Sequence, residues 1–194
     1  MKQIFFDANV WIDYSWRRNF SRTTGRHKKK ALLIHNLKIT GTRVTLTFPL
    51  LYEISSHFKD YSILQDMLAD GFGAFEFSKI KRDYRLNRAG RRKVDDIYNQ
   101  IVNMRQTRDQ ILVNWLNEKN FEKVFKLTDG YEIDFLDAIH VVAASIANCN
   151  IFVTKDESLL KRIESASRKF KKLQNIDFVT PNKFKQKYST LFKK

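Results

Sequence analysis

Residues 3–9 read QIFFDAN, a short and continuous apolar run that ends at a carboxylate. An apolar run of this length is typical of a strand that is buried on both faces, as in a parallel sheet. The helical start Val10–Ile12 follows soon after Asp7. The segment therefore predicts a central strand that passes directly into a helix, with Asp7 at the junction.

Three further segments show the same order of strand and then helix. In each segment, a run of apolar or β-branched residues is followed by a residue that commonly begins a helix. These helix-starting residues are Pro49, Asp156 and Pro181. Strands that alternate with helices predict an α/β fold in which a parallel central sheet is flanked by helices. The three predicted strands are Val44–Phe48, Asn150–Thr154 and Ile176–Val179.

The middle of the chain, residues 61–130, predicts a helical insertion or arm. The run Phe75–Phe77 is a candidate for an extra strand, and a short helix is expected over Lys30–Lys38, after a loop at 21–30. With only two Pro, six Gly and no low-complexity linker, residues 1–194 are predicted to form one domain that carries this insertion. The apolar residues at helical spacing are Tyr98, Ile101, Val102, Ile111, Leu112, Trp115 and Leu116.

The chain is strongly basic, and its charge is unevenly distributed. Its 194 residues include 36 Lys and Arg against 21 Asp and Glu, for a net charge of +15. The excess lies in Arg17–Lys30, Lys79–Arg105 and Lys161–Lys194, whereas residues 106–160 hold nine acids against five basic residues. This distribution predicts a polyanion as partner, with an ordinary solvated basic surface as the alternative.

Composition excludes several classes of protein. The single Cys149 excludes a disulfide framework and a cysteine-based zinc site. No apolar run approaches the roughly 18–20 residues of a membrane span, and the N-terminus passes straight into the first predicted strand, so no signal peptide is expected. There is no glycine-rich phosphate loop. We therefore expect a soluble, cytoplasmic protein without a membrane partner.

Acidic residues recur where the predicted strands end. Asp7 and Asp156 follow strands, Glu53 lies one turn into the helix after the second strand, and Asp134 and Asp137 begin another helix three residues apart. Ligands of parallel sheets bind outside the carboxyl ends of the strands. The alternative for Asp7, Asp134 and Asp156 is a helix N-cap, and Glu53 would also favour the positive end of its helix.

Carboxylates gathered at one edge either hold raised pKa values or bind a hard cation. Because no histidine or cysteine is expected at metal spacing, the oxygen ligands favour Mg²⁺ or Mn²⁺ over zinc. A metal bound by clustered carboxylates on a strongly basic protein suggests hydrolysis of phosphodiester bonds. His140, a lone histidine in an apolar helix, is expected to be packed or capping rather than catalytic.

The segments Ile4–Val10, Leu51–Ile54, Asp137–Ala144 and Phe152–Asp156 resemble, in order and spacing, the four acidic motifs of PIN-domain nucleases. The likeness is strongest to the ribonuclease toxins of bacterial and archaeal toxin–antitoxin pairs. It covers residues 1–60 and 130–182 but not the long middle segment.

The resemblance implies a fold, an activity and specific roles for these residues. The implied fold is a doubly wound sheet, and the implied activity is cleavage of RNA that depends on Mg²⁺ or Mn²⁺. Homodimers are frequent in the family, and a toxin would also have an antitoxin partner. Position 8 is Ala where Thr or Ser is common in the family. The catalytic, metal-binding residues would be Asp7, Glu53, Asp137 and Asp156, with Asp134 as an auxiliary candidate and Asn9 and Thr154 in support.

A basic segment within the arm is the predicted contact to nucleic acid. Tyr84 lies among basic side chains and is a candidate to stack on a base, with a solvated basic helix as the alternative. The sequence therefore predicts a metal-dependent endoribonuclease. A non-catalytic nucleic-acid-binding protein or a structural subunit is the alternative. The predicted contact residues are Lys81, Arg82, Tyr84, Arg85 and Arg88.

Overall fold

Five parallel strands form the central sheet of the residues that the structure describes. The structure is a computed structural model that describes residues 1–20, 32–38, 40–104, 107 and 110–193. The strands lie in the order β3-β2-β1-β4-β5, and every pair is parallel. The predicted α/β fold with a parallel sheet is confirmed. The strands are β1 (Lys2–Phe6), β2 (Thr42–Thr47), β3 (Ile111–Leu112), β4 (Ile151–Val153) and β5 (Asp177–Val179).

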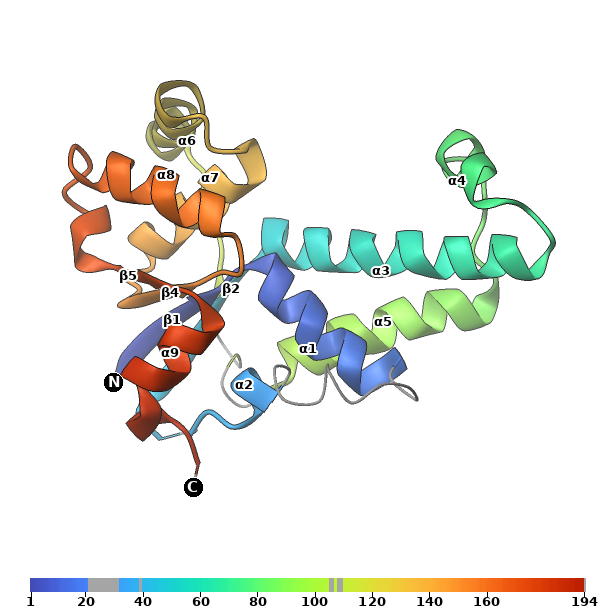
Figure 1. Cartoon of the computed structure of the whole chain (residues 1–194), viewed down its shortest axis with the longest axis horizontal. Coiled ribbons are helices and arrows are strands. Elements are labelled where there is room, and N and C mark those ends of the chain that lie inside the picture. The colour runs from blue at the N-terminus through green and yellow to red at the C-terminus, as the bar shows by residue number, and fades with distance from the viewer. Residues whose placement is uncertain (21–31, 39, 105–106, 108–109, 194) are drawn as a thin grey trace.

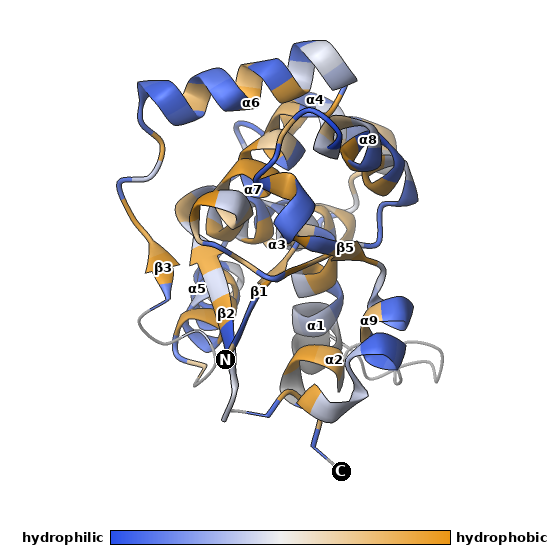
Figure 2. Cartoon of the chain, turned by 90° about the vertical axis from the view of Figure 1, so that its left-hand side faces the viewer, coloured by the Kyte–Doolittle hydropathy of each residue, from blue (hydrophilic) through white to orange (hydrophobic). Residues whose placement is uncertain are grey.

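Helices cover both faces of this sheet. Figure 1 shows α6, α7 and α8 on one side of the sheet and α1, α2 and α9 on the other, and Figure 2 shows the same layers from the end. Because parallel strands need crossover connections, each return passes over one face of the sheet. These helices are α1 (Ala8–Phe20), α2 (Leu32–His35), α6 (Glu118–Tyr131), α7 (Phe135–Ile146), α8 (Glu157–Ser167) and α9 (Pro181–Lys187).

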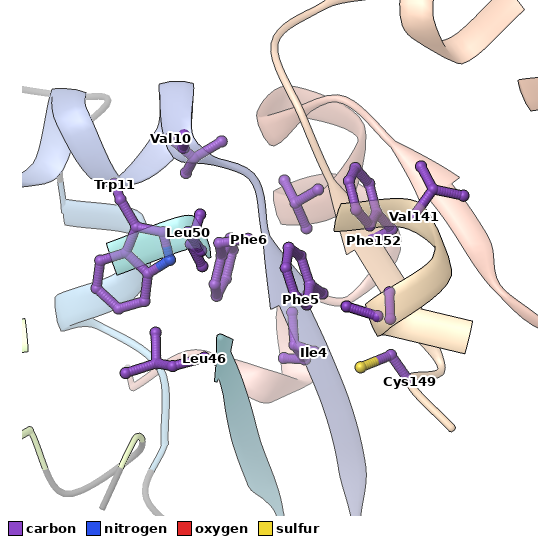
Figure 3. Close-up of a cluster of buried hydrophobic side chains, with 14 of the residues drawn as sticks. Ile4, Phe5, Phe6, Val10, Trp11, Leu46, Leu50, Val141, Cys149 and Phe152 are labelled. Carbon is purple, nitrogen blue, oxygen red and sulfur yellow. The ribbon is translucent and has the colours of Figure 1, made fainter. Parts of the chain in front are cut away.

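The first strand lies at the centre of the hydrophobic core. Its alternating side chains point to opposite faces, as the two-residue period of a strand requires. The Phe5 ring stacks on Phe152 of β4 with centroids 5.3 Å apart, whereas Phe6 packs edge-on against Trp11 of α1 at 6.2 Å (Figure 3). All four rings are fully buried. The apolar run at residues 4–6 thus contributes to the core on both faces of the sheet, and it places Asp7 at the end of the central strand.

A helical arm projects from the sheet. It consists of α3 (Phe48–Ala69) and α5 (Arg88–Val102), which run side by side, and the short α4 (Ala74–Ile80) near the far end (Figure 1). At 1.5 Å per residue the 22 residues of α3 extend about 33 Å. The first turns of α3, which contain Glu53, stay at the sheet, and the rest of the same helix extends into the arm.

Two predictions about the middle segment are wrong. Residues 75–77 lie in α4 rather than in a strand, because the Glu76 carboxylate accepts the Gly73 backbone N–H at 2.7 Å and caps a helix there. Ile111 and Leu112 form strand β3 rather than part of a helix, because their backbone pairs with Leu46 and Thr47 at the edge of the sheet. The helical arm is therefore shorter than residues 61–130.

The remaining boundaries differ by small amounts. Thr47 caps α3 through its side chain, so Phe48 begins the helix instead of ending strand β2. The predicted helix at 30–38 is observed as the four residues of α2, and the predicted loop at 21–30 lies outside the described residues. Pro181 opens α9 as expected. In the described part of the chain, no helix combines the length and the apolar character needed to cross a membrane.

Candidate active site

Asp7 is held in place by donors from two elements. It follows β1 directly, lies at the start of α1 and is only 3% exposed. Its Oδ1 accepts the Ala8 backbone N–H at 2.8 Å, and its Oδ2 accepts the Asn9 amide and the Thr154 hydroxyl, both at 2.7 Å. A buried carboxylate with this many donors has one orientation, so Asp7 is a preorganised group at the carboxyl edge of the sheet.

Asn9 and Thr154 join the ends of two neighbouring strands. The Asn9 amide also donates to the Thr154 hydroxyl oxygen at 3.0 Å, and its carbonyl oxygen accepts the Lys155 backbone N–H at 3.0 Å. The fully buried Thr154 oxygen further accepts the Asp156 backbone N–H at 3.0 Å. The contacts expected of a supporting pair are therefore present around Asp7, although position 8 carries no hydroxyl.

His140 lies between two of the acids. Its Nδ1 is 3.2 Å from Asp7 Oδ1, its Nε2 is 3.5 Å from Glu53 Oε2, and its side chain has no exposed surface. The ring is packed, with its centroid 5.8 Å from that of Phe5. The prediction that no histidine lies at metal spacing is wrong, because ligand atoms of Asp7, Asp137 and His140 all lie within 4.8 Å of one another.

Asp137 shares the first turns of α7 with His140, three residues before it. Burial raises the pKa of the Asp137 carboxyl to about 7, and the charge of Asp7 adds to this effect while His140 opposes it. The carboxyls of Asp134 and Asp156 raise this pKa further. Functional sites often contain a carboxyl group whose pKa is shifted toward neutral pH by burial and by a neighbouring carboxylate.

Glu53, on α3, lies next to the group formed by Asp7, Asp137 and His140. Burial raises the pKa of its carboxyl, with His140 acting against this shift and the charges of Asp7 and Asp134 adding to it. Its Oε2 and the Nε2 of His140 are both buried, and neither atom has a hydrogen-bond partner among the described residues. These two atoms face each other at 3.5 Å, and a cation bound between them would satisfy both.

Asp134 and Asp156 are helix N-caps at the rim of the site. Asp134 Oδ1 accepts the Leu136 backbone N–H at 3.0 Å, and Asp156 Oδ1 accepts those of Ser158 and Leu159 at 2.8 and 2.9 Å. Both side chains are exposed. The capping alternative is thus observed for both residues. Capping occupies only Oδ1 of each carboxylate, and Oδ2 accepts none of these backbone N–H groups.

The group of Asp7, Asp137 and His140 could hold a divalent cation. Its two carboxylates and imidazole form a mixed oxygen and nitrogen set, with Glu53 adjacent and two further acids at the rim. Carboxylate oxygens favour Mg²⁺ and Mn²⁺, whereas an imidazole is also a good ligand for zinc. The choice of Mg²⁺ or Mn²⁺ over zinc therefore rests on the number of carboxylates and not on the absence of histidine.

No family model, curated protein or solved structure matches this chain. What the site does must therefore be inferred from its own residues.

The basic residues predicted to contact nucleic acid all lie on the arm, away from the acidic group (Figure 1). Lys81 forms an ion pair with Asp60 at 2.6 Å. The Tyr84 hydroxyl donates to Asp70 at 2.6 Å, and this bond raises the pKa of Tyr84 to about 12. The side chains of Arg82, Arg85 and Arg88 form no hydrogen bond or ion pair with another described residue.

Asp137→Asn is expected to stabilise the metal-free protein at pH 8. The native pKa is near 7 and the ordinary value is 3.8, so between these values the native state binds more protons than the unfolded state. Stability then falls as pH rises through this window, and the substitution removes the loss. With the partial exposure of Asp137 discounted, we expect a gain of roughly 1 kcal/mol, or about 2–4 °C in thermal midpoint.

Thermal unfolding with a chelator at pH 4 and pH 8 measures this effect. The difference between variant and wild type is expected to shrink toward pH 4. Asp129→Asn, an exposed residue of α6, is the matched control and should show no pH-dependent difference. An equal or lower midpoint for Asp137→Asn at pH 8 would contradict the raised pKa.

Proposed function

We propose that this protein is a metal-dependent endoribonuclease with a PIN-like fold. The observation that carries the proposal is the group of buried Asp7 and His140 and half-buried Asp137 at the carboxyl edge of an all-parallel sheet, with Glu53 beside it. Ligand sites of parallel sheets lie at this edge. The resemblance of the four acidic segments to the PIN-domain motifs agrees with that position.

Each acidic residue has a distinct role in this proposal. Asp7, fixed by its donors, and Asp137 would hold one cation, and Glu53 would complete the set from α3. When bound, a divalent cation supplies a hydroxide nucleophile near neutral pH and neutralises charge on the attacked phosphate. Because the Asp137 pKa is about 7, this carboxyl must lose its proton before it can bind a cation well.

Exposed aromatic side chains on the helices that carry the acids support a single-stranded substrate. Tyr52 and Phe48 lie, like Glu53, in the first turns of α3 and are 72% and 55% exposed. Phe135, between Asp134 and Asp137 in sequence, is 38% exposed. Unpaired bases stack on such rings, whereas bases within a duplex are not available to them. The net charge of +15 supports attraction of the phosphate backbone.

The biological role that we propose for this nuclease is that of a toxin in a toxin–antitoxin pair. It rests on the resemblance of the two ends of the chain to ribonuclease toxins, which also implies an antitoxin partner and a homodimer. The arm extends the chain beyond the compact members of that family. The side chains of Arg82, Arg85 and Arg88 have no partner among the described residues and are available to hold RNA.

Cleavage assays on labelled single-stranded RNA, single-stranded DNA and duplex DNA test the activity. With Mn²⁺ or Mg²⁺ we expect internal cuts in the RNA and at least about tenfold slower cleavage of the duplex. A chelator should abolish cleavage, and Zn²⁺ should be included because of His140. Strong, salt-sensitive binding without turnover in any of these metals would instead favour a non-catalytic nucleic-acid-binding protein.

A further inference from the structure

A groove rich in lysine lies between α6, the end of α7 and the turn after α8. It has a volume of about 430 Å³. Its lysines come from two separate parts of the chain, three from α6 and three from the turn that leads into the 3-10 helix η1 (Leu173–Asn175). These residues are Lys119, Lys123 and Lys126, and Lys169, Lys171 and Lys172.

The lysines on α6 form one stripe. Their spacing of four and then three residues places them on a single face of the helix. The other face of α6 carries Phe121 and Phe125, whose rings pack against Phe135 at the start of α7. The blue and orange bands of α6 in Figure 2 show these alternating polar and apolar positions. The helix therefore separates the groove from the aromatic side chains near the acidic site.

The floor of the groove is apolar. Leu127, Val142 and Leu173 line it and are almost fully buried, and Phe170 is half-buried beside them, with its ring 6.0 Å from that of Tyr131. Lysines around an apolar floor form an amphipathic surface. A ligand that fits it must carry both negative charge and apolar groups.

The positive charge of the groove is poorly compensated. Lys123 is crowded by Lys119 and Lys172, and burial and these two like charges lower its pKa, with Glu122 opposing. Glu122 is itself bound to Lys126 at 2.7 Å. Among the described residues, no ion pair reaches Lys119, Lys169, Lys171 or Lys172. Bringing like charges together costs free energy, and an anionic partner would recover it.

We propose that this groove binds an acidic polypeptide segment in which carboxylates alternate with apolar side chains. The carboxylates would meet the lysine rim, and the apolar side chains would lie on Leu127, Val142 and Phe170. Val142 and Ser145 lie toward the end of α7, whereas Asp137 is in its first turn, so the groove is separate from the acidic site. Binding there does not depend on the proposed nuclease activity.

An acidic peptide suits this groove better than a nucleic acid does. Nucleic-acid grooves combine basic residues with exposed aromatic rings, on which bases stack, or with Arg, which binds phosphate bidentately. The lining of this groove holds six Lys, no Arg and one half-buried ring that already packs on Tyr131. The phosphates of a nucleic acid could pair with the lysines, but they would make no apolar contact with the floor of the groove.

Fluorescence anisotropy with three probes tests the proposal. The probes are a peptide of repeated Glu-Glu-Leu units, a neutral peptide of repeated Gln-Gln-Leu units and a single-stranded RNA oligonucleotide. The full chain should bind the acidic peptide at least about tenfold more tightly than the neutral one, and added salt should weaken this binding. Equal affinity for the two peptides would overturn the proposal.

Charge reversal locates the binding site. The double variant Lys123→Glu with Lys172→Glu should bind the acidic peptide at least about tenfold more weakly, whereas Lys2→Glu with Lys185→Glu, which changes the net charge equally, should lose less than about threefold. In the wild type, the peptide should slow amide exchange in residues 119–127 and 168–173. This readout does not depend on how well a variant folds. Loss of RNA binding but not of peptide binding in the groove variant would assign the groove to nucleic acid and overturn the proposal.

Discussion

Asp7→Asn is expected to lower the rate of RNA cleavage by about 10³-fold in saturating Mn²⁺. Asp7 is the most tightly held of the acids, with donors from Ala8, Asn9 and Thr154. An amide of the same size keeps the packing but removes the negative charge that would attract the cation. A bound cation contributes several kcal/mol to stabilisation of the transition state, and each 1.4 kcal/mol is about a tenfold change in rate.

Metal binding can be followed in the same variant without an activity assay. Mn²⁺ should raise the thermal midpoint of the wild type, since a ligand that binds only the native state stabilises it. The Asp7→Asn protein should show little of this increase. Asp129→Asn removes one exposed carboxylate from α6 and should keep both the cleavage rate and the increase in midpoint. Cleavage by Asp7→Asn at the wild-type rate would contradict the assignment of the site.

The sheet and the position of Asp7 were predictable because they depend on local patterns. A continuous apolar run such as residues 4–6 indicates a buried strand, and the carboxyl edge of a parallel sheet gathers whatever follows its strands. Asn9 and Thr154 were also predicted as supporting residues, through the family resemblance, with Thr154 assigned to the fourth acid. The structure shows both as donors to Asp7.

Strand β3 was not predictable in the same way. It has only two residues, Ile111 and Leu112, and its existence depends on the edge of β2 rather than on its own sequence. Two apolar residues after a long helical region fit a helical spacing as well as a strand. A short element that is defined by its neighbour leaves no periodic pattern of its own.

The place of His140 in the site could not be deduced from spacing alone. Its neighbours Ile139 and Val141 are core residues, so the sequence favoured a packed histidine. The ring is packed, but its two nitrogens face Asp7 and Glu53, which are distant in sequence. Its position one turn after Asp137 places both on one side of the helix, but this spacing does not distinguish a site residue from a core residue. The N-cap role of Asp134 and Asp156, in contrast, was considered from the sequence and is observed, because capping depends only on neighbouring residues.

His140→Ala is expected to destabilise the metal-free protein by about 3 kcal/mol, or roughly 6–12 °C in thermal midpoint. The side chain is fully buried, so its removal leaves a cavity beside Phe5. It also takes away the group that lies between Asp7 and Glu53 and so leaves two neighbouring acids to repel each other. Cleavage should fall by about 10–100-fold, as is usual when a partner of metal ligands is lost.

His140→Gln separates the cavity from the polar contacts. Glutamine fills part of the volume and keeps one N–H donor within reach of Asp7, so it should recover part of the stability and part of the rate. His140→Leu fills a similar volume without a donor and should recover neither the rate nor the orientation of Asp7. Chemical denaturation and cleavage in Mn²⁺ measure both effects. If Leu and Gln restore the rate equally, the volume of His140 matters rather than its nitrogens, and its role in holding the two carboxylates apart is wrong.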